Sequence, residues 1–224
     1  MPAVASACAP PICWLAARSR LTSSARISLI RKESVSVAEH RLKPLTPLGH
    51  DLPESVTIGP VTIAEVIDTA LASLATRSGR SADVAQAAQA AGIPLPEPGR
   101  CADAAPYGAF WLGPEAWMIE APFASHEDIR SHLRGLFGDA ASITEQTDAW
   151  ARFDVTGSDL PALFERLCNA DLRAASPGFA TRTVMDHLGC YLLMRAPDRI
   201  SVIGPRSSAA VLFHALETAA RSAF

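Results

Sequence analysis

Short apolar runs alternate with longer amphipathic stretches along most of the chain after residue 55. Apolar residues at every second position, or in short continuous runs, predict strands at 56–58, 61–63, 109–112, 116–120, 141–146, 150–155, 183–185, 191–194 and 199–203. Apolar residues spaced three and four apart predict helices at 64–75, 81–91, 125–137, 160–169 and 205–221. Glycines and prolines separate these segments, as is typical of turns.

The predicted strands come in pairs that are typical of antiparallel hairpins. Gly113-Pro114-Glu115 forms a tight turn between 109–112 and 116–120, and Gly189 lies between 183–185 and 191–194. Helices follow the strands regularly along the body of the chain. This order predicts an α+β fold with ferredoxin-like halves and mixed or antiparallel sheets, and it argues against a doubly wound parallel sheet.

Residues 40–56 combine prolines with regularly spaced leucines, and the prolines keep this stretch from being a helix. The leucines are Leu42, Leu45, Leu48 and Leu52. A plain linker is one interpretation, but such regular leucines favour an extended arm that lies across an apolar surface. We therefore divide the chain into an arm with helices at 40–106 and an α+β domain at 107–224.

The amino-acid composition adds to the predicted division of the chain only at the N-terminus. The 224 residues are 49% hydrophobic and 19% charged with a net charge of −3, which is ordinary for a globular protein and excludes a strongly basic nucleic-acid-binding surface. Residues 1–32, in contrast, contain Arg and Lys but no Asp or Glu. We expect 1–39 to be a disordered or mis-called basic extension; a transit peptide and an arm for nucleic acid or membrane are the alternatives.

The cysteines predict no disulfide framework. They are odd in number and scattered, at Cys8, Cys13, Cys101, Cys168 and Cys190. This usage fits a reducing compartment, and we expect a cytoplasmic protein. No apolar run is long enough to span a bilayer. Cys168 and Cys190 lie in apolar stretches and are expected to be core residues.

No candidate catalytic, cofactor-binding or metal-binding group emerges from the sequence. The histidines are dispersed, and His126 and His132 are expected on different faces of one helix. Asp186-His187 is better explained by a hydrogen-bonded turn than by a metal site. There is no phosphate-binding glycine motif. Paired carboxylates for acid–base chemistry are not visible.

Several segments resemble the folate-binding aminomethyltransferase superfamily, and within it the gamma subunit of heterotetrameric sarcosine oxidase. Residues 148–172 show a strand, a glycine, a helix with repeated leucines and then Asp-Leu. The more specific likeness lies in Pro-Leu-Thr-Pro-Leu-Gly, Trp-Leu-Gly-Pro-Glu-Ala-Trp, Phe-Ala-Thr-Arg-Thr and the C-terminal strand region, at 44–49, 111–117, 179–183 and 199–207. The likeness covers roughly residues 40–222.

The resemblance implies a subunit of a bacterial enzyme that oxidises sarcosine to glycine, with hydrogen peroxide and either formaldehyde or 5,10-methylenetetrahydrofolate as products. It implies FAD, FMN and NAD on partner chains, no cofactor on this one, and alpha, beta and delta subunits as partners. Aminomethyltransferases place an acidic pair after the hairpin glycine to hold folate. Here Gly189 is followed by Cys190-Tyr-Leu-Leu-Met194, so the stand-alone folate-binding protein is the alternative.

The chain would then act through its contacts with partner subunits. We expect the arm to pack on a partner, because its leucines have no predicted helix or strand to join. Phe110, Trp111 and Trp117 surround the turn at Gly113 and form either hairpin core or a protein contact. The predicted interface residues are Leu42, Leu45, Leu48, Leu52, Trp111, Trp117 and Arg182.

Overall fold

The computed structural model of the protein describes residues 43–224, which form one compact unit. The predicted extension at 1–39 and the predicted interface residue Leu42 lie outside the described residues. The elements of the first half are β1 (Ser55–Ile58), β2 (Val61–Val66), β3 (Thr69–Thr76), α1 (Ser81–Ala91), β4 (Cys101–Ala104), β5 (Tyr107–Gly113), β6 (Ala116–Pro122) and α2 (Ile129–Phe137). They are followed by β7 (Ala141–Glu145), β8 (Trp150–Gly157), α3 (Leu160–Phe164), β9 (Ala180–Met185), β10 (Leu188–Ala196), β11 (Arg199–Pro205) and α4 (Ala209–Ala223).

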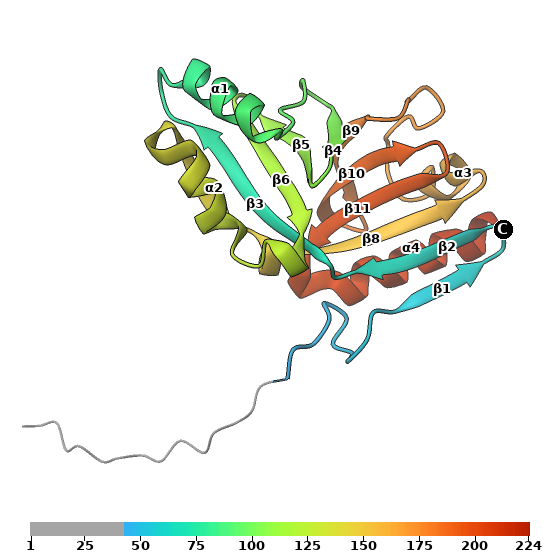
Figure 1. The fold of residues 1–224 in the computed structure, drawn as a ribbon. Coiled ribbons are helices and arrows are strands. Elements are labelled where there is room, and N and C mark those ends of the chain that lie inside the picture. The colour runs from blue at the N-terminus through green and yellow to red at the C-terminus, as the bar shows by residue number, and fades with distance from the viewer. Residues whose placement is uncertain (1–42) are drawn as a thin grey trace, which may run out of the picture. The chain divides into compact units, whose positions relative to one another are not determined.

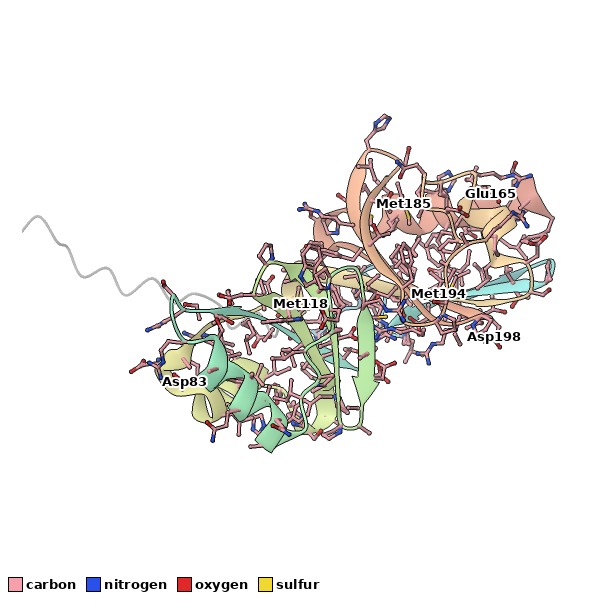
Figure 2. All side chains as sticks on the ribbon, turned by 90° about the horizontal axis from the view of Figure 1, so that it is seen from above. Asp83, Met118, Glu165, Met185, Met194 and Asp198 are labelled. Atoms are coloured by element: carbon pink, nitrogen blue, oxygen red, sulfur yellow. The ribbon has the colours of Figure 1, made fainter. Side chains whose placement is uncertain are left out.

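The strands form two antiparallel sheets, which confirms the predicted α+β class. The six-stranded sheet has the order β1-β2-β8-β11-β10-β9, and the five-stranded sheet has the order β4-β5-β6-β3-β7. Helices α3 and α4 cover one face of the six-stranded sheet, whereas α1 and α2 cover one face of the five-stranded sheet (Figure 1). Figure 2 shows Asp83 of α1 and Glu165 beside α3 at opposite ends of the described part.

In the sequence, the five-stranded sheet lies between two strands that are neighbours in the other sheet. β2 pairs with β8, with Val66 opposite Arg152 and Val61 opposite Gly157. All strands between them in the sequence belong to the five-stranded sheet. The boundary expected at residue 106 therefore runs through this inserted sheet, since β4 precedes it and its partner β5 follows it.

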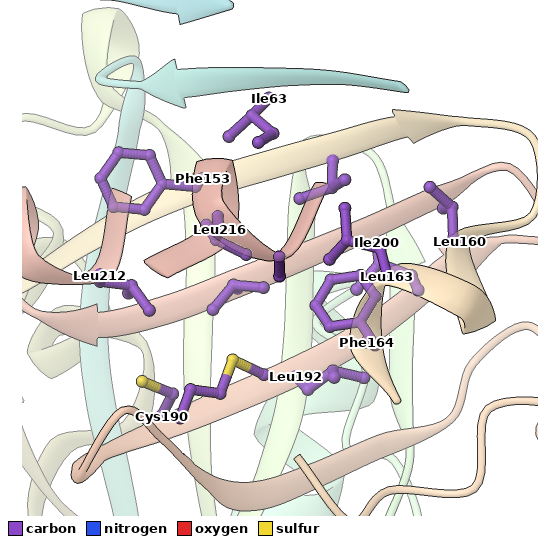
Figure 3. Packing of buried hydrophobic residues seen from close by; sticks show 14 of the residues in the cluster. Ile63, Phe153, Leu160, Leu163, Phe164, Cys190, Leu192, Ile200, Leu212 and Leu216 are labelled. Atoms are coloured by element: carbon purple, nitrogen blue, oxygen red, sulfur yellow. The ribbon is translucent and has the colours of Figure 1, made fainter. Parts of the chain in front are cut away.

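Three apolar clusters form the core. The largest lies between the six-stranded sheet and its helices, where Phe153 and Leu192 of the sheet contact the side of α3 and α4 that carries Leu163 and Leu216 (Figure 3). A second cluster fills the space between the five-stranded sheet and α1 and α2. The third is smaller and joins the remaining faces of the two sheets, which we call the inner faces; its members include Leu71, Phe110, Met118, Leu193 and Ile203.

The predicted helix at 64–75 is wrong, because this segment forms the end of β2 and most of β3. β3 is a central strand between β6 and β7, and both of its faces are covered. Ala70, Ala72 and Leu74 pack toward the helices, while Leu71 packs between the sheets. A strand that is buried on both faces loses its apolar–polar alternation, and its apolar residues then imitate helical spacing.

Two predicted helices and one predicted hairpin are present, but their ends or turns lie at other residues than expected. Helix α2 starts at Ile129, where the Asp128 side chain accepts a 3.0 Å hydrogen bond from the backbone N–H of Ser131, rather than at residue 125. Helix α3 ends at Phe164 and does not reach residue 169. The β9–β10 hairpin turns at Asp186 and His187, which have φ angles of 45° and 67°, so Gly189 lies inside β10.

Within residues 43–224, no helix is both long and apolar enough to cross a membrane.

Candidate functional site

An open pocket of about 340 Å³ lies where the inner faces of the two sheets meet. Its walls carry opposite charges, so we call it the two-walled pocket. Asp103 and Glu120 of the five-stranded sheet form the acidic wall, with Asp68 from the β2–β3 connection. Arg152, Arg195 and Arg199 of the six-stranded sheet form the basic wall.

A buried ion pair connects the two walls. Arg195 Nη2 lies 2.5 Å from Glu120 Oε2, and both side chains are 6% exposed. Arg195 Nη1 also donates to Asp103 Oδ1 at 2.9 Å. Burial alone would lower the pKa of Arg195, but the Glu120 and Asp103 carboxylates outweigh it and raise that pKa. Arg195 therefore keeps its positive charge at neutral pH.

A second network of hydrogen bonds joins two arginines of the basic wall to Asp154. Arg152 makes two hydrogen bonds to Asp154, at 2.9 and 3.1 Å, and Arg199 Nη2 donates to Asp154 Oδ2 at 2.6 Å. The buried Ser201 hydroxyl donates to Asp154 Oδ1 at 2.7 Å. Burial would raise the pKa of Asp154, but these donors outweigh it and hold the pKa below its ordinary value.

Strand register explains how these side chains meet. Arg152 and Asp154 are two residues apart on β8 and so lie on the same face. Ser201 is directly opposite Asp154. Pairing of β10 with β11 shifts between Met194 and Ala196, which leaves Arg195 at a β-bulge, a feature that redirects side chains.

Gly108 makes room for the acidic wall. A Cβ at this position would come within 2.8 Å of Asp103 Oδ1 and 3.1 Å of Glu120 Oε2. Any side chain here would therefore displace the two carboxylates that bind Arg195.

One oxygen of the pocket is buried without a hydrogen bond. Glu120 Oε1 has no hydrogen-bond partner among the described residues. Arg152 Nη1 lies 3.6 Å from this oxygen, which is beyond hydrogen-bond range. The pocket thus keeps one acceptor without a hydrogen bond on a carboxylate that lies close to the guanidinium groups of Arg152 and Arg195.

Tyr107 contributes to the lining of the pocket, but its side chain packs in the cluster between the five-stranded sheet and its helices. There the Tyr107 hydroxyl lies 2.7 Å from His132 Nε2. The His126 and His132 rings are 4.9 Å apart. The expectation that these histidines point apart is therefore wrong: His126 precedes α2 instead of belonging to it, so helical spacing does not apply. Burial raises the pKa of Tyr107.

The described cysteines Cys101, Cys168 and Cys190 are free thiols. Cys190 is buried and Cys168 packs against the same cluster, as expected of core residues. Burial, with a contribution from nearby Cys168, raises the pKa of Cys190 to about 11. Burial also raises the pKa of Cys101. Thiols with raised pKa values are poor nucleophiles at neutral pH.

The predicted arm is attached to its own domain. The buried Glu65 carboxylate accepts backbone N–H groups of Leu48 at 2.9 Å and Glu54 at 3.1 Å. Leu48 packs partly against the main cluster, so the expectation that the arm leucines have no partner in this chain is wrong for Leu48. Leu45 and Leu52 are 49% and 76% exposed.

The predicted aromatic cluster is split between two faces. Phe110 is buried between the sheets, whereas Trp111 and Trp117 line a separate groove of about 380 Å³ with the proline-rich loop before β4. Trp117 Nε1 donates to the Pro96 carbonyl at 2.9 Å, so this residue supports that loop. Arg182 is exposed on edge strand β9, with its guanidinium 5.8 Å from the Tyr191 ring centre.

The structure does not bring the predicted interface residues into one patch with the two-walled pocket. Residues 43–224 contain no group of three or more His, Cys, Asp and Glu side chains suited to a metal ion. The pocket carboxylates Asp103 and Glu120 are paired with arginines, which suits recognition of charge better than proton transfer.

Sequence reasoning missed this pocket. Its one local signal is the Arg152–Asp154 spacing on a strand that otherwise reads as buried. Glu120 and Arg195 are 75 residues apart and meet only because the two sheets pack. No motif records such a contact.

Neither a protein-family model nor a curated protein matches this chain. Among solved structures, it is similar to a chain of the heterotetrameric sarcosine oxidase from Corynebacterium sp. U-96 in complex with pyrrole 2-carboxylate, with a TM-score of 0.64 and 21% identity over 75% of this chain and 88% of that chain. It is also similar to the glycine cleavage system aminomethyltransferase T from Bartonella henselae, with a TM-score of 0.55 and 12% identity over 74% of this chain. That match spans only 50% of the aminomethyltransferase. The protein therefore has an α+β fold with two antiparallel sheets that resembles the folds of sarcosine oxidase and aminomethyltransferase chains.

Proposed function

We propose that this protein is a non-catalytic subunit, of the gamma type, in a sarcosine oxidase complex that converts sarcosine to glycine. The observation that carries the proposal is a fold likeness that extends over 88% of a chain from a heterotetrameric sarcosine oxidase. The same fold accounts for only half of the aminomethyltransferase. A near full-length counterpart inside an assembly favours a subunit over a lone transferase.

The chemistry of the chain supports an assembly role. The buried carboxylates of Glu120 and Asp154 are paired with arginines, and the thiols at Cys101 and Cys190 have raised pKa values. Redox chemistry would come from FAD, FMN and NAD on alpha and beta subunits, with delta as the remaining partner. The complex would act in the cytoplasm and release hydrogen peroxide with formaldehyde or 5,10-methylenetetrahydrofolate.

Co-purification tests this proposal directly. The full chain, tagged at its C-terminus, is isolated from its native cells and the visible absorbance spectrum is recorded. We expect two larger chains and one smaller chain to accompany it, with flavin absorbance and sarcosine-dependent peroxide formation. A colourless protein without these chains would contradict the proposal.

The arm supplies the proposed contact with a partner. Leu45 and Leu52 are exposed, yet hydrogen bonds to Glu65 and from Arg206 Nη2 to the Leu45 carbonyl, at 2.9 Å, hold the arm in place. Pre-ordered apolar side chains bind with a smaller entropic cost. Deletion of 40–56 would also remove part of β1, so substitutions are the cleaner test.

We expect the double variant Leu45→Asp, Leu52→Asp to fold but to leave the complex. Val211→Asp is the matched control, because Val211 is similarly exposed, at 48%, on α4. Size-exclusion chromatography with flavin detection separates the outcomes. Normal assembly of the arm variant, or equal loss in the control, would remove the arm from the interface.

The alternative is a stand-alone folate-binding protein, which the aminomethyltransferase-like fold favours. Calorimetric titration of the isolated chain with tetrahydrofolate decides it, since micromolar binding would support this alternative. The absence of carboxylates at Cys190–Met194 argues against it.

A further inference from the structure

Some charged side chains of the two-walled pocket keep hydrogen-bonding atoms that its internal ion pairs do not use. The acidic wall comes from the five-stranded sheet and the β2–β3 connection, and the basic wall comes from the six-stranded sheet. Each wall thus faces a group of opposite sign across an open space of about 340 Å³. A molecule that lies across this space would meet carboxylates at one end and guanidinium groups at the other.

The acidic wall has a free acceptor at a defined atom. Glu120 is 5% exposed, and its Oε1 has no hydrogen-bond partner within residues 43–224. The other oxygen, Oε2, is already bound to Arg195. Leaving a buried charged acceptor without a hydrogen bond is costly. A positively charged N–H donor is the group that satisfies it best, because hydrogen bonds between ions are the strongest.

The basic wall has free donors at its outer end. Arg199 is 48% exposed, and it uses Nε and Nη2 for Asp154. Its Nη1 makes no hydrogen bond to the described residues and can bind an anionic group from solvent. Arginine forks are well suited to carboxylates.

We propose that the two-walled pocket binds a small zwitterion of the amino-acid class, with its ammonium group on Glu120 Oε1 and its carboxylate on Arg199. The pocket volume is at the lower end of the range for small-molecule sites, which favours a compact ligand. The three carboxylates and three guanidinium groups that line the pocket balance each other, so a ligand of zero net charge leaves that balance unchanged.

This site lies on the chain itself and does not depend on assembly with other subunits. It therefore goes beyond the proposed function, and its test uses the isolated full chain. Failure to bind a zwitterion would leave the co-purification result untouched, and the reverse also holds.

Isothermal titration calorimetry at low salt tests the proposal with two zwitterions, glycine and 4-aminobutyrate, which differ in the distance between their charges. Methylammonium and acetate are the half-ligand probes. We expect one zwitterion to bind at least roughly tenfold more tightly than either half, because each end contributes a charged hydrogen bond. Equal binding of a half-ligand, or no heat from either zwitterion at roughly 10 mM, would overturn the proposal.

Matched variants identify the atoms. Glu120→Gln and Arg199→Gln should each weaken binding about tenfold or more. Asp139→Asn and Arg221→Gln, exposed residues outside the pocket, should leave binding unchanged. Circular dichroism checks that each variant is folded. If Glu120→Gln is unfolded, the Arg199→Gln variant tests the proposal, because Arg199 is half exposed. Wild-type affinity in a folded Arg199→Gln variant would refute the assignment.

Discussion

Asp154 illustrates how one buried carboxylate shapes the chemistry of its neighbours. Its two oxygens accept hydrogen bonds from Arg152, Arg199 and Ser201, which come from two adjacent strands. The low pKa of Asp154 shows that these donors favour the ionised form despite burial. Such a group stabilises the fold only while it is charged.

We predict that this residue contributes to acid sensitivity. Because the folded-state pKa lies below the ordinary value of 3.8, its stabilising effect is complete above that value and is lost as the pH falls below it. Asp154→Asn should lower the free energy of unfolding at pH 7 by about 3 kcal/mol or more, since it leaves buried arginines without a counter-charge. Urea titrations at pH 7 and below pH 4 measure this. A gap between wild type and variant that stays constant over this range would contradict the prediction.

Gly157 at the end of β8 gives a second prediction at this scale. Its φ angle is +137°, and a Cβ would lie 2.1 Å from the Pro60 carbonyl oxygen of the neighbouring turn. Gly157→Ala should therefore cost about 3 kcal/mol of unfolding free energy. Gly113→Ala, where no atom lies within 4 Å and φ is outside the left-handed region, serves as the control and should cost less than about 1 kcal/mol. Chemical denaturation compares the two, and equal losses would refute the steric explanation.

At the scale of elements, sequence patterns succeeded where structure is local. The hairpin of β5 and β6 was predicted because its turn and both strands are continuous in sequence. The end of β2 and β3 were mistaken for a helix because β3 is paired with β6 and β7 and packs against α2, which are all distant in the chain. The same distance hides the contact between Glu120 and Arg195. Pairings between remote segments were therefore the part that sequence could not predict.

The arm is held in a fixed position by hydrogen bonds to Glu65, although it is neither helix nor strand. Glu65→Gln keeps the side-chain shape but replaces one of the two acceptor oxygens that hold the Leu48 and Glu54 amides. Loss of one charged hydrogen bond, about 1.5–3 kcal/mol, should speed exchange of these amides roughly tenfold to a hundredfold. Hydrogen exchange measured by NMR tests this, with Asp139→Asn as the control. Unchanged protection in Glu65→Gln would show that the arm is held by other contacts.

The whole molecule depends on a narrow junction between its two sheets. The third cluster and the Arg195–Glu120 pair belong to this junction, together with backbone hydrogen bonds from Cys101 to Gly178 and from Ala180 to Gly99. The ring centres of the fully buried Phe110 and of Tyr191 lie 5.2 Å apart across it. The other two clusters each belong to one sheet and its helices. The side chains of this junction therefore help to couple the unfolding of the two sheets.

We predict that Phe110→Ala lowers stability by about 3–5 kcal/mol and separates the unfolding of the sheets into two steps. Phe137→Ala, in the cluster of the five-stranded sheet alone, should cost a similar amount. It should not, however, weaken the junction. Differential scanning calorimetry distinguishes them: the ratio of van't Hoff to calorimetric enthalpy should fall below that of wild type only for Phe110→Ala. The same ratio in both variants would rule out a special role for the junction.

The position of the five-stranded sheet in the sequence, between β2 and β8, also determines the order in which the strand pairs can form during synthesis. β2 leaves the ribosome long before its partner β8, and every strand of the five-stranded sheet emerges between them. That sheet can form all of its pairings while the β1–β2 hairpin still lacks its neighbour β8. The six-stranded sheet must wait for strands up to β11, a long-range closure that slows folding. Until then, the β1–β2 hairpin presents an open edge on the nascent chain, and that edge is the region most exposed to mispairing.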